Sequence, residues 1–182
     1  ANYVNRVLTL VARASDAGSN PLMGLPGLEG YPEFRAFIEG KISGSMESME
    51  RQRFKEALRK VMDIAQEGNG FLQRAEPWKY LKSDLPSDRE KALKPLSAAW
   101  HSLRVLAILT HPFMPFQSQR LWGMIGEPGE SSEETWDEAL KADNRPGVLP
   151  SVAPLFARLD LDEILSREIE SDKVKSEAGP VE

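Results

Sequence analysis

Residues 96–109, LSAAWHSLRVLAIL, place apolar side chains on nearly every side of a helix. A helix that is apolar on most of its sides has to be covered by neighbouring elements on several faces. We therefore expect this segment to lie at the centre of the fold, with the other helices packed around it. The apolar side chains that define it are Leu96, Trp100, Leu103, Val105, Leu106, Ile108 and Leu109.

The limits of this central helix are predicted from the residue types at its two ends. Ser87 followed by Glu90 is a capping-box pattern, which predicts a helix that starts at Asp88. Pro95 should kink the helix, because a proline in a helix interior removes one backbone donor. His111–Pro112 should end it, with the imidazole next to the negative end of the helix dipole.

Around this centre the sequence shows further stretches of helical period, separated by irregular segments. Two glycines, Gly68 and Gly70, lie late in the longest stretch, where they allow close backbone packing or a bend. Gly126 is placed to close a short helix. We expect helices over residues 1–15, 32–44, 46–75 and 115–125, a loop over 16–31, a helical turn over 136–140, an extended piece over 155–159 and a last helix from Asp160.

The sum of these elements predicts an all-α protein, an antiparallel bundle of five or six helices without internal repeats. Residues 1–165 are expected to form the helical domain, and residues 166–182 the end of the last helix and a charged tail. The chain of 182 residues suits one compact domain. It starts inside a helical pattern without an initiator methionine, which indicates a piece of a longer chain.

Composition excludes several classes of protein. The chain has no cysteine, so disulfides and thiolate metal sites are excluded, and a reducing, cytoplasmic location is expected. Its longest apolar runs are far shorter than the roughly 20 residues of a membrane span, and its start has no signal-peptide pattern. No membrane partner is therefore expected.

The net charge of −5 is divided unevenly along the chain. Residues 1–120 hold 17 Lys and Arg against 13 Asp and Glu, whereas residues 121–182 hold 6 against 15. A polyanion, if one binds, should therefore meet the first two thirds of the chain. Residues 51–60 hold five basic side chains against one acidic one, either a solvated helix face or a contact for nucleic acid.

A tryptophan follows the predicted end of the longest helix, in the sequence FLQRAEPWKYL at residues 71–81. Pro77 should stop the helix and turn the chain at Glu76. Trp78 is then the first side chain beyond a rigid helix end. Its indole either caps the helix by packing into the core or leaves a flat face free to stack on a ligand.

A stripe of polar side chains runs along the helix predicted for residues 1–15. Asn5, Thr9 and Arg13 are spaced four residues apart and so lie one above another, with Arg6 beside them. This stripe is either a solvated helix side or a row of donors that faces a ligand.

No pattern of reactive residues predicts catalysis. The serines lie in no GxSxG sequence, and neither His101 nor His111 stands in an HExxH or ExxH pattern, so no metal site is expected. We expect His101 to be a structural residue near the surface. The chain by itself is predicted to be non-catalytic and to bind no cofactor.

Three segments in order resemble the helical anticodon-binding domain of methionyl-tRNA synthetase, a class I aminoacyl-tRNA synthetase. They are ANYVNRVLTLVAR at 1–13, FKEALRKVMDIAQEGNGFLQRAEPWKYLK at 54–82 and LRVLAILTHPFMPFQSQRLWGMIG at 103–126. A fourth, APLFARLDLDEI at 153–164, resembles the family's return segment toward the catalytic domain. AEPWK after a long helix, with HPFMPF about thirty residues later, is the specific combination.

The resemblance implies a domain that reads the CAU anticodon of methionine tRNA. In the family a tryptophan stacks on an anticodon base, the proline before it shapes the site, and an Asn and an Arg one turn apart contact the anticodon. These positions match Trp78, Pro77 and Arg13, but Thr9 stands where the asparagine is expected. Threonine lacks a separate donor and acceptor for bidentate base reading, so that contact is weaker, water mediated or shifted to Asn5.

The resemblance also implies a parent enzyme, an ATP-dependent ligase that attaches methionine to its tRNA. The HIGH and KMSKS motifs and the zinc-binding cysteines of its catalytic domain are absent here, and we expect that domain, the second partner of this chain, upstream of Ala1. Two alternatives remain at this stage. One is the anticodon domain of the leucine, isoleucine, valine or cysteine enzyme, and the other is a helical protein-interaction module without RNA.

Overall fold

The computed structural model describes residues 2–15, 19–83, 85–141, 146 and 153–156. Within this part the chain is helical and contains no strand, as the sequence predicts. The α-helices are α1 (Asn2–Ala14), α2 (Pro32–Glu50), α3 (Phe54–Ala75), α4 (Pro86–Thr110) and α5 (Pro115–Met124). Three short 3-10 helices complete it: η1 (Leu28–Gly30), η2 (Pro77–Lys79) and η3 (Trp136–Glu138).

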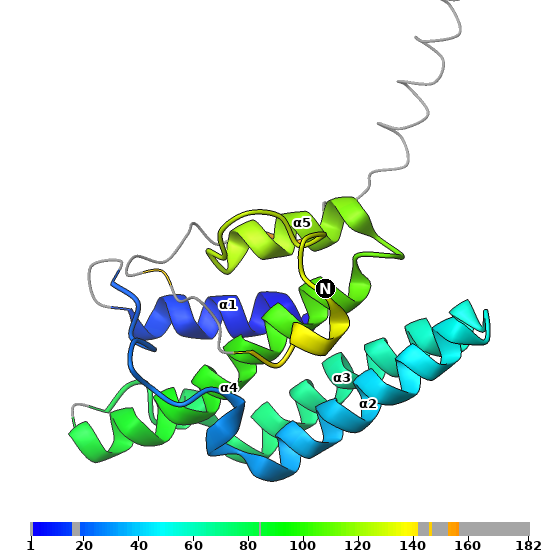
Figure 1. The fold of residues 1–182 in the computed structure, drawn as a ribbon. Helices are drawn as coiled ribbons and strands as arrows, with labels where there is room; N and C mark the ends of the chain where they lie inside the picture. The colour runs from blue at the N-terminus through cyan, green and yellow to red at the C-terminus, as the bar shows by residue number, and fades with distance from the viewer. Residues whose placement is uncertain (1, 16–18, 84, 142–145, 147–152, 157–182) are drawn as a thin grey trace, which may run out of the picture.

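Helix α4 is the central element. Every residue from Pro95 to Thr110 is buried, including the polar His101 and Arg104. Figure 1 shows α2 and α3 side by side as a long hairpin that projects to one side of α4, with α1 and α5 on the other side. This arrangement confirms the prediction that the apolar segment is covered on several faces. None of the described helices has the length and hydropathy needed to cross a bilayer.

The start of α4 differs from the prediction. The helix begins at Pro86, and no side chain caps its N-terminus, so the expected capping box of Ser87 does not form. Proline suits the first helical position because its missing N–H would have no partner there. Ser83, three residues before the helix, joins the preceding turn to its first turn: Ser83 Oγ accepts from Leu85 N–H at 3.3 Å and donates to Asp88 Oδ2 at 2.9 Å.

The helix expected over residues 46–75 is in fact two helices. Helix α2 continues to Glu50, the chain turns, and α3 begins at Phe54. Gln52 has a φ of 57°, and the Arg53 and Gln52 N–H groups donate to the carbonyls of Ser48 at 2.8 Å and Met49 at 2.9 Å. This is a Schellman turn with glutamine at the left-handed position, where glycine is usual. Because no Gly or Pro marks residues 51–53, the sequence pattern missed it.

The two late glycines of α3 have different roles. Gly68 faces Tyr3 of α1, whose ring would be 2.3 Å from a methyl group added there, so this glycine permits close packing of the two helices. Gly70 contacts only side chains of its own helix. The close packing proposed from the sequence is thus confirmed at Gly68.

The prediction that His101 lies near the surface is wrong. The residue is fully buried on α4. Its Nδ1 accepts the N–H of Leu28 at 3.3 Å, and its Nε2 donates to the carbonyl of Lys141 at 2.8 Å. The imidazole therefore ties two loops to the central helix. His111 takes the expected position at the C-cap of α4.

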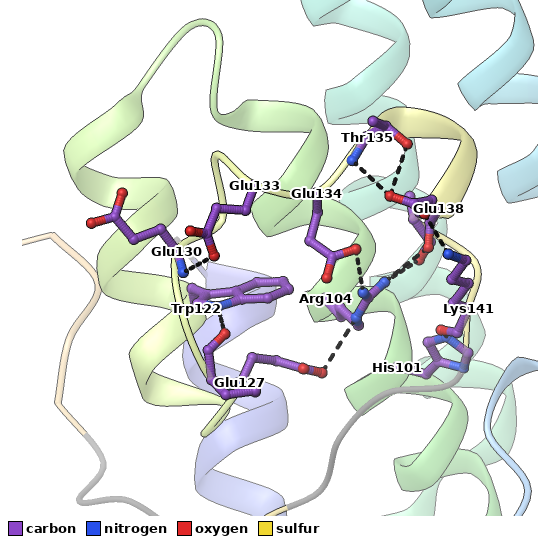
Figure 2. Close-up of polar contacts among 12 residues, drawn as sticks. His101, Arg104, Trp122, Glu127, Glu130, Glu133, Glu134, Thr135, Glu138 and Lys141 are labelled. Carbon is purple, nitrogen blue, oxygen red and sulfur yellow. Dashed lines mark hydrogen bonds and ion pairs between the residues drawn. The ribbon is translucent and has the colours of Figure 1, made fainter.

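A buried arginine holds the acidic segment that follows α5 (Figure 2). Arg104 lies on α4, and its guanidinium pairs with Glu134 at 2.8 Å and with Glu127 at 3.4 Å. It also donates to the backbone carbonyls of Glu138 and Ala139, and it lies 5.3 Å from the ring centroid of Trp122. Residues 127–139 are thus packed back onto the core.

Four further predictions agree with the structure. Helix α1 buries its apolar face, α5 begins at Pro115, Gly126 follows its end with a φ of 75°, and η3 matches the helical turn expected over 136–140. Most of the piece expected over 155–159, the helix from Asp160 and the boundary at 165 lie outside the described residues.

Candidate functional site

The end of α3 presents Trp78 as the sequence predicts. Glu76 adopts a left-handed conformation, with φ 44° and ψ 47°, and its N–H donates to the carbonyl of Leu72 at 2.9 Å. Pro77 is buried and begins η2, so the chain leaves the helix with a fixed direction. Trp78 itself is half-buried and packs partly against the core. The indole therefore rests partly on the core, and part of it remains exposed to solvent.

The polar stripe of α1 lies beside this tryptophan. A groove of about 360 Å³ is bounded by Trp78 on one side and by α1 on the other, and it is lined by Asn5, Arg6, Thr9, Leu10, Arg13 and Trp78. Four of the five residues singled out in the sequence thus meet in one groove, while the fifth, Pro77, lies buried next to Trp78. The stripe is 65 or more residues away from the tryptophan in the chain, so the packing of α1 brings them together.

Arg6, which the sequence places beside the polar stripe, also lines the groove. Its guanidinium carbon lies 4.7 Å from the centroid of the Trp78 ring, within the range of a cation–π contact. Its Nη2 donates to Oε1 of Gln73, in the last turns of α3, at 3.3 Å. The signal for it was the seven-residue spacing from Arg13, which places both cations on one side of the helix, two turns apart.

Asn5 has a structural contact in addition to its place in the groove. Its side-chain Oδ1 accepts the N–H of Leu155 at 3.2 Å. The acceptor of this amide is therefore engaged, and its NH₂ group remains the part of the side chain that can donate to a ligand.

The groove is positively charged. Two of its lining residues are arginines and none is acidic. Arg13 is exposed and makes no ion pair within the described part of the chain. A half-open site with two cations and an aromatic ring suits an anionic ligand that carries flat groups.

The basic run over residues 51–60 is a weaker candidate. Arg51 pairs with Glu47 at 2.8 Å, Lys60 pairs with Glu56 at 3.0 Å, and Arg53 lies 3.7 Å from the same Glu56. These pairs neutralise much of the charge at the tip of the α2–α3 hairpin. The ion pairs favour a solvated helix face over a contact for nucleic acid at this run.

A larger groove, of about 640 Å³, lies between the start of α2 and the end of α3. Its aromatic wall contains Phe34 stacked on Phe71 at 4.6 Å, with Tyr31 edge-on to Phe71 at 4.9 Å. Two glutamates and one arginine line it, and burial raises the pKa of Tyr31. This groove carries a net negative charge, so the smaller groove is the better site for a polyanion.

Neither histidine belongs to a metal-binding cluster of the described residues. No three His, Cys, Asp or Glu side chains among these residues are arranged to hold a metal ion. Both histidines are engaged in contacts within the fold, His101 with two backbone groups and His111 with Ser131 Oγ at 3.0 Å.

Comparison with known families decides between the alternatives for the family of this chain. The family described as the anticodon binding domain of methionyl tRNA ligase matches residues 31–167. This chain belongs to that family. The match favours the methionyl-tRNA ligase family over the leucine, isoleucine, valine and cysteine enzymes and over a protein-interaction module without RNA.

Two curated proteins that are similar to this chain are named methionine–tRNA ligase. Methionine–tRNA ligase of Aeropyrum pernix is 37% identical over 171 residues, which are 91% of this chain and 28% of that protein. Methionine–tRNA ligase of Pyrobaculum calidifontis is 36% identical over 166 residues, which are 90% of this chain and 27% of that protein. The chain thus spans little more than a quarter of the length of these relatives.

Solved structures support the fold. The free form of Mycobacterium tuberculosis methionyl-tRNA synthetase superimposes with a TM-score of 0.72 at 20% identity, covering 87% of this chain and 31% of that one. The same enzyme in complex with methionyl-adenylate gives a TM-score of 0.72 at 21% identity, with 86% and 30% covered. The helical fold of this chain is therefore shared with part of these synthetases.

Proposed function

We propose that this domain recognises the CAU anticodon of methionine tRNA in the groove between α1 and Trp78. The observation that carries the proposal is the convergence of Trp78, Thr9 and the exposed Arg13 in one groove without a carboxylate. Single-stranded RNA loops are recognised by stacking of splayed bases on aromatic rings, with side-chain hydrogen bonds to the base edges. The groove offers both kinds of contact.

Each groove residue has a separate part in this proposal. Trp78 stacks on one anticodon base, and Pro77 fixes the direction in which the indole leaves α3. Arg13 donates to a base edge or a phosphate through its guanidinium fork. Thr9 contributes one hydroxyl, and Asn5 contributes donors only, since its acceptor is used by Leu155.

The acidic segment after α5 is consistent with this placement. Arg104 holds residues 127–139 on the core, and all the carboxylates of the chain's last third that the structure describes belong to this packed segment. Like charges near an RNA backbone repel it. The segment would therefore discourage RNA from docking on the α5 side of the fold.

From the names of the relatives we further propose which enzyme contains this domain. It is a methionine–tRNA ligase that uses ATP to attach methionine to its tRNA, works in the cytoplasm, and carries its catalytic domain elsewhere in the chain. This domain would supply tRNA selection and hold no ATP itself. Its partners are then the tRNA and the catalytic domain.

The test is the affinity of this chain for a methionine tRNA transcript, measured by filter binding for the native chain and for Trp78→Ala. A stacked base is worth about 1 to 3 kcal/mol, so the variant should bind roughly five- to 150-fold more weakly while its circular dichroism stays helical. Trp136→Ala is the matched control, because this tryptophan is also half-buried but lies on η3. Equal affinities for the native chain and Trp78→Ala would refute the proposal.

A further inference from the structure

The contact between Arg6 and Trp78 joins three elements at the groove. Arg6 comes from α1, Gln73 from α3 and Trp78 from η2. The guanidinium lies 4.7 Å from the indole centroid and donates to the Gln73 amide at 3.3 Å. The ring of Trp78 is thus held against α1 by a side chain that is itself anchored on α3.

The charge of Arg6 is not neutralised. In the part of the chain that the structure describes, the half-buried guanidinium pairs with no carboxylate, and its partners are a π face and a neutral amide. A guanidinium that stacks on an aromatic ring is a planar group with a fixed fork, which a lysine does not reproduce. The geometry of the pair therefore depends on arginine in particular.

Trp78 needs such support because of its place in the chain. It lies in a three-residue 3-10 helix and is half-buried, so its backbone turn alone leaves the indole free to change rotamer. An aromatic side chain that is ordered before binding loses less conformational entropy when a base stacks on it. A contact that orders the free ring therefore increases the affinity for the base.

We propose that Arg6 is a positioning residue of the anticodon site: its guanidinium, anchored by Gln73, contacts the ring of Trp78 and holds the indole in a fixed orientation at the edge of the groove. This inference rests on the proposed function of the groove and deepens it. Arg6 acts through Trp78, whereas Arg13, seven residues further along α1, faces the ligand directly.

The first experiment is a double-mutant cycle in tRNA binding with Arg6→Ala, Trp78→Ala and the double variant. Arg6→Ala alone should lower affinity by about two- to fivefold, the factor that an exposed cation–π contact is worth. In the Trp78→Ala background the same change should have no further effect, and the dependence of binding on salt should keep its slope. Arg59→Ala, an exposed arginine on α3 outside the groove, controls for loss of charge alone.

The second experiment observes the indole in the free chain. With 5-fluorotryptophan incorporated, the ¹⁹F resonance of Trp78, assigned by its loss in Trp78→Phe, should shift and broaden in Arg6→Ala. The resonances of Trp100 and Trp122, which are buried in the core, should not move. Arg6→Lys should restore the native spectrum only in part, because it cannot stack as a plane.

The outcomes separate this inference from the function it rests on. An Arg6→Ala effect that persists in the Trp78→Ala background, with a salt slope lower by about one, would identify a direct phosphate contact and overturn the positioning role. An unchanged Trp78 resonance would overturn it as well. If Trp78→Ala itself binds tRNA normally, the proposed function fails, while the fluorine spectrum still reports whether Arg6 orders the ring.

Discussion

The phenol ring of Tyr3 lies so close to Gly68 that a methyl group on this glycine would be 2.3 Å from Cζ of the ring. The hydroxyl of the same ring lies 2.7 Å from Ser102 Oγ on α4. One side chain of α1 is therefore fixed against both α3 and α4. Since Asn5, Thr9 and Arg13 follow on the same helix, this contact determines where the polar stripe lies relative to Trp78.

A methyl group at Gly68 should destabilise the fold, although alanine favours helix. Gly68→Ala forces the Tyr3 ring or α1 to move, and overpacking of this kind costs about 1 to 3 kcal/mol. Gly70→Ala, two residues later, meets mainly the flexible end of Arg74 and should stabilise by up to about 1 kcal/mol. Urea unfolding followed by circular dichroism measures both. Equal shifts for the two variants would contradict the packing role of Gly68.

Burial of Tyr3 should make stability fall at alkaline pH. The ring is buried, and burial raises the pKa of its hydroxyl above the ordinary value, while the hydrogen bond with Ser102 opposes this in part. In the unfolded chain the hydroxyl titrates near pH 10. The folded chain keeps the proton above that pH and the unfolded chain loses it, so the stabilisation is complete below about pH 10 and decreases as the pH rises further.

The check is the free energy of unfolding of the native chain and of Tyr3→Phe between pH 8 and pH 11. The native chain should lose up to about 1.4 kcal/mol per pH unit above pH 10 from this group. Tyr3→Phe should start lower by about 1 kcal/mol, because it lacks the hydrogen bond, and should show a shallower decrease. Parallel curves for the two proteins would show that Tyr3 is not the titrating group.

The fold could be predicted because its strongest signals are local. The apolar residues on all sides of 96–109 identified the central helix, and Pro115 identified the start of α5 from its immediate neighbours. The turn at Gln52 could not be predicted, since a glutamine in a left-handed conformation lacks the glycine that usually marks a Schellman turn. The same holds for buried His101, whose partners are 73 and 40 residues away.

Individual residues of the candidate site could be predicted from local patterns, but their meeting in one groove could not. A four-residue period gave Asn5, Thr9 and Arg13, and Pro77 gave an exposed position for Trp78. That these face one groove follows from how α1 packs on α3 and α4. The sequence placed Arg6 beside this stripe but could not predict its contact with Trp78, a residue 72 positions later in the chain.

Removal of the buried cation at Arg104 should destabilise the fold strongly. In Arg104→Met the carboxylate of Glu127, whose side chain is 5% exposed, loses this buried cation, and breaking a buried pair in this way costs about 3 to 5 kcal/mol. The acidic segment should also detach, which speeds cleavage by trypsin after Lys141. Both changes are measured on the purified variant, by urea unfolding and by timed proteolysis.

Arg51→Met is the matched control for Arg104. It breaks an ion pair with Glu47 in which both side chains are more than half exposed, and such pairs contribute less than about 1 kcal/mol. Similar small losses for the two variants would mean that the Arg104 cluster does not hold the segment.

Arg13 should contribute to the choice between anticodons. Arg13→Ala removes an exposed guanidinium from the groove without breaking an ion pair of the described structure, so the fold should be unchanged. Loss of a bidentate base contact reduces discrimination by about 1 to 3 kcal/mol. The measurement is the ratio of affinities for tRNAs with CAU and with single-base variants of it, with Arg59→Ala as control. If the ratio is unchanged while overall affinity falls, Arg13 contacts phosphate only.

Thr9 is the position at which a gain of function is expected. Thr9→Asn places an amide in the groove, one turn before Arg13 and one turn after Asn5, and an amide can donate and accept on the same base edge. Asparagine and threonine have similar helix propensities, so α1 should remain stable. Discrimination of CAU should then improve by up to about tenfold, as for one added base contact. Thr9→Val, which keeps the shape and removes the hydroxyl, should reduce it. If neither change alters discrimination, base reading on this stripe belongs to the free NH₂ group of Asn5 and to Arg13.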